Sequence, residues 1–305
     1  MIRFLVRRLL EMLPLLVLLS LLIFLLFQLI PGDYLSEMEL NPSISRQTIE
    51  DLRRDYGLDK PFYIQYFLWL RELFRGNLGY SFAQQRPAVD LIAERLGNTV
   101  VLTISSLTLT LLFSFPLGIY AALNPHRWPD RLVLLISLGG LSLPTVLASL
   151  LLLYFAFHTG WFPLGGTGGF RSLVLPSLAL AMPSVAFFVR NLRLEMIETL
   201  RQPFVLAAAA RGLPAHRVIF HALRNALNPT ISMAGITFGG LLSGSVVVEK
   251  IFDWPGLGAL TVDSILSRDL FVVLNCVLAA ALLIAFANLL ADLILAWNDP
   301  RIRYS

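Results

Sequence analysis

The sequence predicts an all-α polytopic membrane protein with six transmembrane helices and an extended external segment between the first two. Two observations lead to this class. Of the 305 residues, 56% are hydrophobic and only 14% are charged, whereas roughly a quarter of a soluble domain is charged. Apolar windows of about 20 residues, long enough to cross about 30 Å of hydrocarbon, also recur along the chain. Because lipid offers no partner for an open backbone amide, each window should be helical.

Six apolar windows define the predicted spans. The first follows Arg3, Arg7 and Arg8, but its apolar run is too long for a signal-peptide core and no small-x-small cleavage site follows it, so it should remain as an anchor. Pro176 and Pro183 interrupt the fourth window, which makes its pattern the weakest. The predicted spans are residues 12–30, 100–123, 132–157, 173–189, 230–248 and 270–291.

The distribution of basic residues predicts the orientation of the spans. With six spans, the N-terminus, the 124–131 loop, the 190–229 loop and the C-terminal tail share one side of the membrane and hold most of the arginines. Basic loops stay on the cytoplasmic side, so both termini are predicted to be cytoplasmic, in a bacterial inner membrane. The net charge of +4 then reflects membrane topology and not nucleic-acid binding.

The chain is expected to divide into three parts. Residues 1–30 form the cytoplasmic N-terminus and the first span, and residues 31–99 form an external segment. Residues 100–305 form a core of the remaining five spans that includes the cytoplasmic loop 190–229.

The external segment should contain two helices, at residues 46–56 and 63–74, with turns marked by Gly57, Pro61 and Gly76. A second and shorter external segment, 249–269, contains a rigid turn that begins at Trp254. Aromatic residues in these two segments are candidates for an external gate or for contact with a soluble partner, although interfacial aromatics serving only as membrane anchors are an equally open interpretation. They are Tyr66, Trp69, Tyr80 and Trp254.

The most informative pattern lies in the 190–229 loop, where four alanines precede Arg211-Gly212 and then Pro214. A helix can end at Gly212 and a second can begin at Pro214. Alanine on every face lets the backbone of another protein approach closely. The pattern therefore predicts a helical hairpin that docks a partner protein, and so a transporter subunit that a partner drives.

Side chains around this hairpin supply the rest of the predicted docking surface. Phe204, Val205 and Leu206 would be apolar anchors. Arg217, His221 and Arg224 recur at roughly helical spacing and suit acidic groups of a partner or lipid phosphate, although ordinary positive-inside charge also explains them. We predict that Gly212→Val leaves membrane insertion intact and uncouples the activity of the driving partner from transport.

Small and hydroxylated residues in the second and fifth spans are candidates for a translocation path. The fifth span has a seam of small residues around Gly235 and Gly244 that is typical of close helix packing, and pore lining is the alternative. Asp292 is the only carboxylate deep in the predicted bilayer region, where it serves either a function or an ion pair. The path candidates are Asn98, Thr103, Ser106, Gly239, Ser243 and Ser245.

Enzyme classes lack their motifs in this sequence. Lys60 and Lys250 are the only lysines, and neither ends a Gly-x-x-x-x-Gly-Lys loop. His216 and His221 do not form the His-Glu-x-x-His pattern of zinc proteases, and the single cysteine, Cys276, excludes an intrachain disulfide. We therefore expect no catalytic site, metal site or bound cofactor. A self-contained secondary transporter or channel is the alternative, but the inverted repeats that it predicts are not seen.

Taken together, short motifs along nearly the whole chain resemble the B-type (first) permease of dipeptide, oligopeptide and nickel ABC importers. The matching stretches are Pro31-Gly32-Asp33, Tyr56-Gly57-Leu58-Asp59-Lys60-Pro61 with Gln65-Tyr66, Gly79-Tyr80-Ser81, Pro116-Leu117-Gly118, Arg211-Gly212 with Arg224-Asn225-Ala226, Trp254-Pro255-Gly256-Leu257-Gly258, Arg268-Asp269 and Asp299-Pro300-Arg301-Ile302-Arg303. In the family's coupling motif polar groups are common where Ala207 and Ala209 stand here, and Arg211 replaces a lysine. The residues that carry over unchanged are Ala208, Ala210 and Gly212.

The resemblance implies a type I ABC importer permease fold and a set of partners. These are a second homologous permease, two cytoplasmic ABC ATPases that bind ATP and Mg²⁺, an external substrate-binding protein and membrane lipid. The implied cargo is a di- or oligopeptide, with a nickel chelate or glutathione as alternatives. The implied ATPase-coupling residues are Phe204, Val205, Ala207, Ala208, Ala210, Arg211, Gly212 and Arg217.

Overall fold

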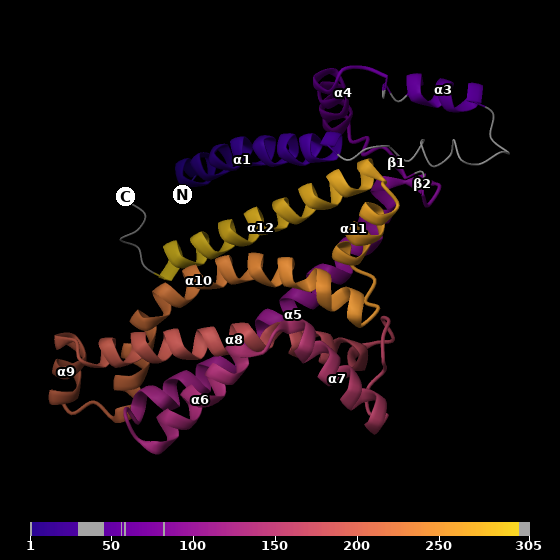
Figure 1. Ribbon diagram of the computed structural model, residues 1–305. Coiled ribbons are helices and arrows are strands. Elements are labelled where there is room, and N and C mark those ends of the chain that lie inside the picture. Colours follow the sequence, from indigo (N-terminus) through magenta and orange to yellow (C-terminus); the bar gives the residue numbers. More distant parts are fainter. Residues whose placement is uncertain (1, 30–45, 56, 58, 82, 299–305) are drawn as a thin grey trace. The chain divides into compact units, whose positions relative to one another are not determined.

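The structure is a computed structural model that describes residues 2–29, 46–55, 57, 59–81 and 83–298 (Figure 1). Helices dominate the described residues, which confirms the predicted helical class. The exception is an unpredicted antiparallel pair of two-residue strands, β1 (Tyr80–Ser81) and β2 (Arg86–Pro87). The helices are α1 (Ile2–Leu29), α3 (Arg46–Asp55), α4 (Phe62–Phe74), α5 (Ala88–Leu123), α6 (Trp128–Ser142), α7 (Thr145–Thr159), α8 (Phe170–Leu200), α9 (Pro203–Ala210), α10 (Ala215–Ile251), α11 (Leu257–Leu266) and α12 (Leu270–Asn298).

Four described helices, α5, α8, α10 and α12, are long and apolar enough to cross a membrane, and α6 with α7 counts as a fifth if the pair is one broken span. α1 carries a shorter apolar stretch, Leu13–Leu26, and residue 30 at the end of the first predicted span lies outside the described residues. The structure thus confirms a helical membrane protein with four or five apolar spans, fewer than the six predicted.

The third predicted span, residues 132–157, is wrong as one continuous helix. α6 ends at Ser142, α7 begins at Thr145, and the two helices bend by 99° at the break. Leu143 between them is extended, with φ −86° and ψ 113°. Because Pro144 follows, the helical conformation is disfavoured at Leu143 and the helix ends there.

The two prolines of the fourth predicted span behave in the opposite way. Pro176 and Pro183 both lie inside α8, which continues unbroken to Leu200. Each proline removes one backbone hydrogen bond. α8 nevertheless packs against α6, α7, α9 and α10, and this burial maintains the helix. The expected weakness of this span is therefore not seen.

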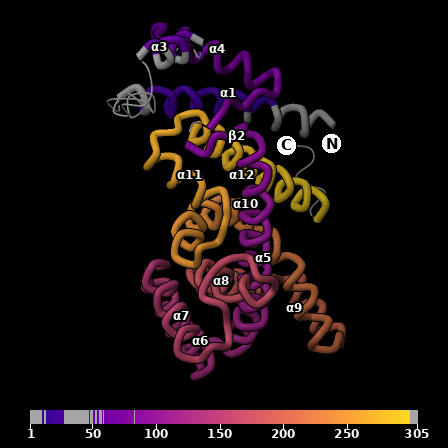
Figure 2. Tube along the Cα trace, turned by 90° about the vertical axis from the view of Figure 1, so that its right-hand side faces the viewer, coloured from indigo at the N-terminus to yellow at the C-terminus, as the bar shows by residue number. Residues whose placement is uncertain are grey.

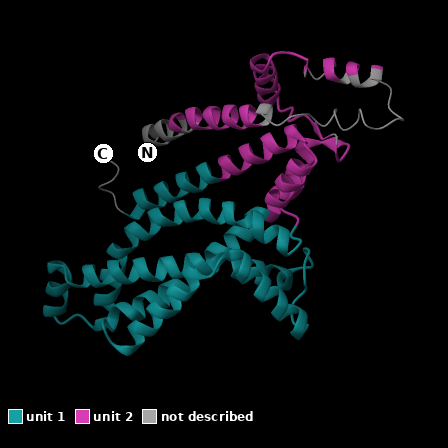
Figure 3. Cartoon of the chain, viewed as in Figure 1, with its two compact units in different colours: residues 1, 99–254, 284–305 teal, residues 2–98, 255–283 magenta. Residues whose placement is uncertain are grey.

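The chain divides into two compact units, which are described separately (Figure 3). The first unit contains residues 99–254 and 284–298 of the described chain. Within it, α6 and α7 each pack against α8 and diverge from one another at their break (Figure 1), and Figure 2 shows the same unit from the side. Its largest buried cluster gathers Leu102 of α5, Leu180 of α8, Val248 of α10 and, after α10, Phe252 and Trp254.

The second unit contains residues 2–98 and 255–283 of the described chain. α3 and α4 confirm the two helices that were predicted in the external segment. One cluster joins Phe24 of α1, Tyr66 and Trp69 of α4, and Leu274 and Leu278 of α12. A second cluster buries Cys276 among apolar residues of α5 and α11, as expected for a packing residue. The motifs at 31–33 and 299–303 lie outside the described residues.

Candidate functional site

α9 forms the first helix of the predicted docking hairpin. Pro203 occupies its first turn, and Arg211 follows its last residue. The chain then turns at Gly212, whose φ of +79° is a conformation that side chains oppose, and the Gly212 amide donates to the Ala209 carbonyl at 3.0 Å. Pro214 immediately precedes α10. The predicted hairpin is therefore confirmed, and its two helices pack against each other.

The surface of α9 is exposed except at one position. Val205 has 2% of its surface exposed and belongs to a buried cluster with Leu192 and Met196 of α8 and Ala222 and Ala226 of α10. This corrects the prediction for Val205, which anchors α9 to its own chain and is not available to a partner. Phe204 and Leu206 are 47% and 58% exposed. Ala207 and Ala210 are exposed, and Ala208 is half-buried.

Two arginines flank the turn of the hairpin. Arg211 and Arg217 are exposed, and within the described residues neither guanidinium group has a hydrogen bond or an ion pair. The hairpin therefore presents two apolar side chains, small alanines and two unpaired cations. Such a surface is suited to a partner with an apolar groove bordered by acidic groups.

A buried ion pair beneath this surface was not predicted. Arg193 of α8 donates from Nε to Asp130 Oδ1 of α6, and from its terminal nitrogen to Asp130 Oδ2 at 2.6 Å. The backbone amide of His126 donates to the same Oδ2 at 2.8 Å, and His126 has a φ of +63°. This two-point pairing fixes the 124–130 loop to α8. Arg193 also directly follows Leu192 of the Val205 cluster, so one part of α8 holds both that loop and α9.

Three of the six predicted path residues lie inside the chain. Thr103 and Ser106 of α5 are buried, and their hydroxyls donate to the carbonyls four residues earlier, those of Thr99 and Leu102. Ser245 of α10 is also buried. In this structure these three side chains do not reach a surface, and their place on a path stays a prediction. Ser243 is exposed, as a path residue would be.

The small residues of α10 serve two faces. A Cβ at Gly239 would lie 3.3 Å from Ile284 of α12, and one at Gly235 would lie 2.9 Å from Ala291 of α12. This close approach supports helix packing at those two glycines, and the place of Gly239 on a path stays a prediction. Gly240, in contrast, has open space around it, and it lies three residues before the exposed Ser243.

Glu249 is the buried carboxylate that sequence reasoning missed. Its side chain is fully buried and accepts hydrogen bonds from Thr99 Oγ1 at 2.7 Å and Ser245 Oγ at 3.1 Å. It lies inside α10, although the second external segment was predicted to begin there. Asp292 is half-buried, so its side chain is more exposed than that of Glu249.

The turn after α10 is a packing feature. The backbone amide of Trp254 donates to the Glu249 carbonyl at 2.8 Å, and the Trp254 side chain is buried, which corrects its assignment to an external contact. In the second unit, Asn98 Nδ2 donates to the Pro255 carbonyl at 2.8 Å. The Asn98 amide therefore supports the turn, and its place on the path stays a prediction.

Tyr66 and Trp69 are also interior residues and not an external platform. Both are buried, and Tyr66 forms a hydrogen bond with Ser20 Oγ of α1 at 2.9 Å. The Tyr66 and Phe24 rings meet edge to face at 5.6 Å. Tyr80 is half-buried in β1. Tyr66 and Trp69 thus help to hold the second unit together.

Other motifs of the second unit meet through long-range hydrogen bonds. Ser81 Oγ donates to the buried Asp269 at 2.6 Å, and Asn275 Nδ2 donates to the Leu78 carbonyl at 2.7 Å. A Cβ at Gly79 would lie 3.2 Å from Phe271, so glycine lets the chain approach α12 here. The sequence showed these motifs but not that they contact one another.

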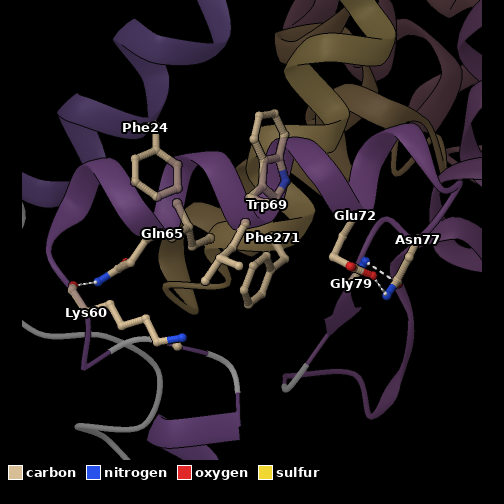
Figure 4. Close-up of a pocket in the computed structure, with 11 residues that line it drawn as sticks. Phe24, Lys60, Gln65, Trp69, Glu72, Asn77, Gly79 and Phe271 are labelled. Carbon is tan, nitrogen blue, oxygen red and sulfur yellow. Dashed lines mark hydrogen bonds between the residues drawn. The ribbon is translucent and has the colours of Figure 1, made fainter.

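A pocket of about 350 Å³ lies between α4 and the start of α12 (Figure 4). Trp69 and Phe271 form part of its wall. Most of its polar groups are used locally, since Gln65 donates to the Lys60 carbonyl at 2.7 Å and Asn77 donates to Glu72 at 3.2 Å. The described residues contain no group of three or more His, Cys, Asp or Glu that could hold a metal ion.

Comparison with protein families and curated proteins gives matches along the whole chain. Residues 114–304 match the family model described as binding-protein-dependent transport system inner membrane component, and residues 1–103 match the N-terminal model of the same systems. The chain is 38% identical over 306 residues to the glutathione transport system permease protein GsiC of Escherichia coli strain K12, and 37% identical to that of Shigella flexneri serotype 5b. Each match covers 100% of both chains.

Solved structures share the fold at low sequence identity. One is the MetNI methionine ABC transporter in an inward-facing conformation, with a TM-score of 0.60 and 17% identity over 69% of this chain and 97% of that one. Another is an amino acid ABC transporter with histidines, with a TM-score of 0.51 and 16% identity over 70% and 94% of the two chains. These similarities show an ABC importer permease fold.

Proposed function

Because the chain belongs to the binding-protein-dependent transport system inner membrane components, we propose that it is the first of two homologous permeases in an importer of short peptides. Membership makes it an ABC importer permease of the inner membrane, without a catalytic site or cofactor of its own, and implies ATPase and binding-protein partners that supply ATP hydrolysis and substrate. A self-contained channel or secondary transporter is thereby excluded.

The observation that carries the proposal is the exposed surface of α9. Phe204 and Leu206 present apolar groups, and Arg211 and Arg217 present cations that have no partner within the described chain. In the proposed orientation, with both termini cytoplasmic, this surface receives one of two ABC ATPases. Val205 then transmits the movement of α9 to α8. The Asp130–Arg193 pair passes this movement on from α8 to α6.

The proposed path lies along the exposed face of α10 that contains Gly240 and Ser243. The second permease would cover this face. We propose that each of the two permeases has six spans, and that α1 is the first span of this chain. Glu249 lies behind the path and positions α10 against α5 through Thr99.

The proposed cargo is a short peptide. The similarity in sequence to GsiC over the entire chain makes glutathione, a tripeptide, the first compound to be tested, ahead of di- and oligopeptides. Membrane vesicles that contain the complete importer should take up labelled glutathione. An excess of unlabelled glutathione, or of another peptide that the importer carries, should reduce this uptake. If uptake responds to neither glutathione nor other peptides, the proposed cargo is wrong.

Gly212→Val tests the coupling surface. A valine at a φ of +79° forces the turn to change, although there is open space for its Cβ. The variant should insert normally and retain basal ATP hydrolysis, while uptake falls at least tenfold. Gly76→Val is the matched control, because Gly76 has a φ of +80° and open space but lies outside the hairpin.

Purification of the tagged chain from its own membranes in mild detergent tests the partners. Mass spectrometry should identify a second permease and P-loop ATPases in the purified complex. A chain that is recovered alone, or only with itself, in several detergents would contradict the proposed assembly.

A further inference from the structure

A groove of about 380 Å³ lies in the first unit, between the start of α10 and the end of α12. Asn298 connects the two helices at this groove, because its Nδ2 donates to Asn228 Oδ1 at 2.5 Å and to the Arg224 carbonyl at 3.4 Å. The groove is lined by Phe220, Leu223, Arg224, Leu227, Trp297 and Asn298.

Among the described residues, the groove combines the unpaired Arg224 cation with apolar walls. Arg224 is exposed, and its guanidinium group has no hydrogen bond or ion pair within the described residues. None of the described lining residues is acidic. Phe220 and Trp297 at the rim are 65% and 77% exposed. A ligand that satisfies this surface carries a negative charge next to hydrocarbon.

The position of Trp297 relates the groove to the membrane surface. Trp297 lies six residues beyond the end of the sixth predicted span, which corresponds to about 9 Å along a helix. The headgroup layer on each side of a bilayer is roughly 5–8 Å thick, so Trp297 lies at its outer edge, and tryptophan is enriched at membrane–water interfaces. Figure 1 shows that the first turns of α10 run in a different direction from the rest of the helix, which contains Pro229.

From this combination we infer that the groove binds an anionic phospholipid of the cytoplasmic leaflet. Arg224 pairs with the phosphate, while Leu223 and Leu227 contact the start of an acyl chain and Trp297 covers it. Basic pockets between membrane helices on the cytoplasmic side bind such lipids. The inference rests on the cytoplasmic orientation in the proposed function.

An ATPase is the competing occupant, but the charge and the apolar surface favour lipid. An ATPase helix would have to cover the exposed Trp297 and Phe220 in addition to the α9 surface. The lipid, in contrast, is present wherever the groove meets the bilayer, and one arginine supplies the pairing that its phosphate needs.

The test uses the complete purified importer, after its ATPases and uptake have been verified. Phosphatidylglycerol or phosphatidylcholine with brominated acyl chains is added, and quenching of tryptophan fluorescence is measured. Brominated phosphatidylglycerol should quench the fluorescence at a lower concentration than brominated phosphatidylcholine. Arg224→Gln should reduce this preference for phosphatidylglycerol about fivefold, as expected for one arginine at an anionic surface. The chain has five tryptophans, so Trp297→Phe should remove only the part of the quenching that distinguishes the two lipids.

Arg127→Gln is the matched control, since it removes an equal charge from an exposed position on the same predicted side but outside the groove. It should keep the preference for phosphatidylglycerol. Native mass spectrometry of retained lipids gives a second measurement that does not depend on fluorescence. An excess of inorganic phosphate should leave retention unchanged, because phosphate alone does not fill the apolar part of the groove.

Three results would overturn the inference. These are equal quenching by the two lipids, an unchanged preference in Arg224→Gln, and loss of the ATPases from Arg224→Gln with lipid retention intact, which would assign the groove to the ATPase. Failure of the proposed function is distinct, because it appears earlier as a wild-type complex without ATPases or uptake.

Discussion

α4 and α9 are short helices outside the long apolar ones, and both were expected to face a partner. They differ in what they bury. α4 buries Tyr66 and Trp69 within the second unit, whereas α9 buries only Val205 and exposes nearly everything else. Burying a large aromatic side chain stabilises the fold strongly, because it removes a large apolar area from water. Burying an alanine side chain stabilises it little. A prominent aromatic residue outside a membrane span is therefore first a candidate for the protein interior. Small residues are the better indication of a docking surface.

Trp69→Ala should have the largest effect in this comparison. Truncating a buried tryptophan leaves a cavity and costs about 3–5 kcal/mol, and Trp69 packs with Phe24 and Tyr66. The melting temperature of the purified chain should fall sharply. Phe74→Ala is the control in the same helix, because Phe74 is 84% exposed and its loss should change stability by less than about 0.5 kcal/mol. Equal melting temperatures of the Trp69→Ala and Phe74→Ala variants would contradict the assignment of Trp69 to the interior.

Val205→Ala and Phe204→Ala distinguish the buried side of α9 from its exposed side. Removing two buried methyl groups at Val205 should cost about 2 kcal/mol and lower the melting temperature. Phe204→Ala should leave the melting temperature nearly unchanged and reduce the amount of ATPase that copurifies with the chain. The opposite result would be that Val205→Ala, and not Phe204→Ala, reduces the copurified ATPase while its melting temperature stays unchanged. Val205 would then contact the ATPase directly.

Tyr66→Phe should have the smallest effect. It removes the hydroxyl that meets Ser20 Oγ and keeps the ring against Phe24. Ser20 still donates to the Val17 carbonyl at 2.9 Å, so the loss should be about 1 kcal/mol. A shift as large as that of Trp69→Ala would mean that the hydrogen bond, and not aromatic packing, holds α4 to α1.

The fold was predictable where a local pattern decides it. The apolar windows gave the long helices, the mixed-charge and aromatic patterns gave α3 and α4, and Gly212 with Pro214 gave the hairpin. Proline was ambiguous, because Pro144 breaks the third predicted span whereas Pro176 and Pro183 do not break α8. Whether a proline ends a helix depends on the packing of the turns around it, which the sequence does not show.

The candidate site was predictable only in part. The exposed members of the α9 surface followed from composition, but Val205 could not be separated from Phe204 and Leu206, since all three are apolar neighbours. The hydroxyls of α5 suggested a wet face, and their donation to backbone carbonyls satisfies them without water.

The sequence alone determined the membrane class, the positions of most helices and the small-faced hairpin, because each depends on hydropathy and backbone preference over a few neighbouring residues. Tertiary structure alone decided which polar groups meet. Asp130 and Arg193 are 63 residues apart, Thr99 and Glu249 are 150 apart, and Ser81 and Asp269 are 188 apart. A buried polar group needs a partner, but no local pattern states which distant residue supplies it.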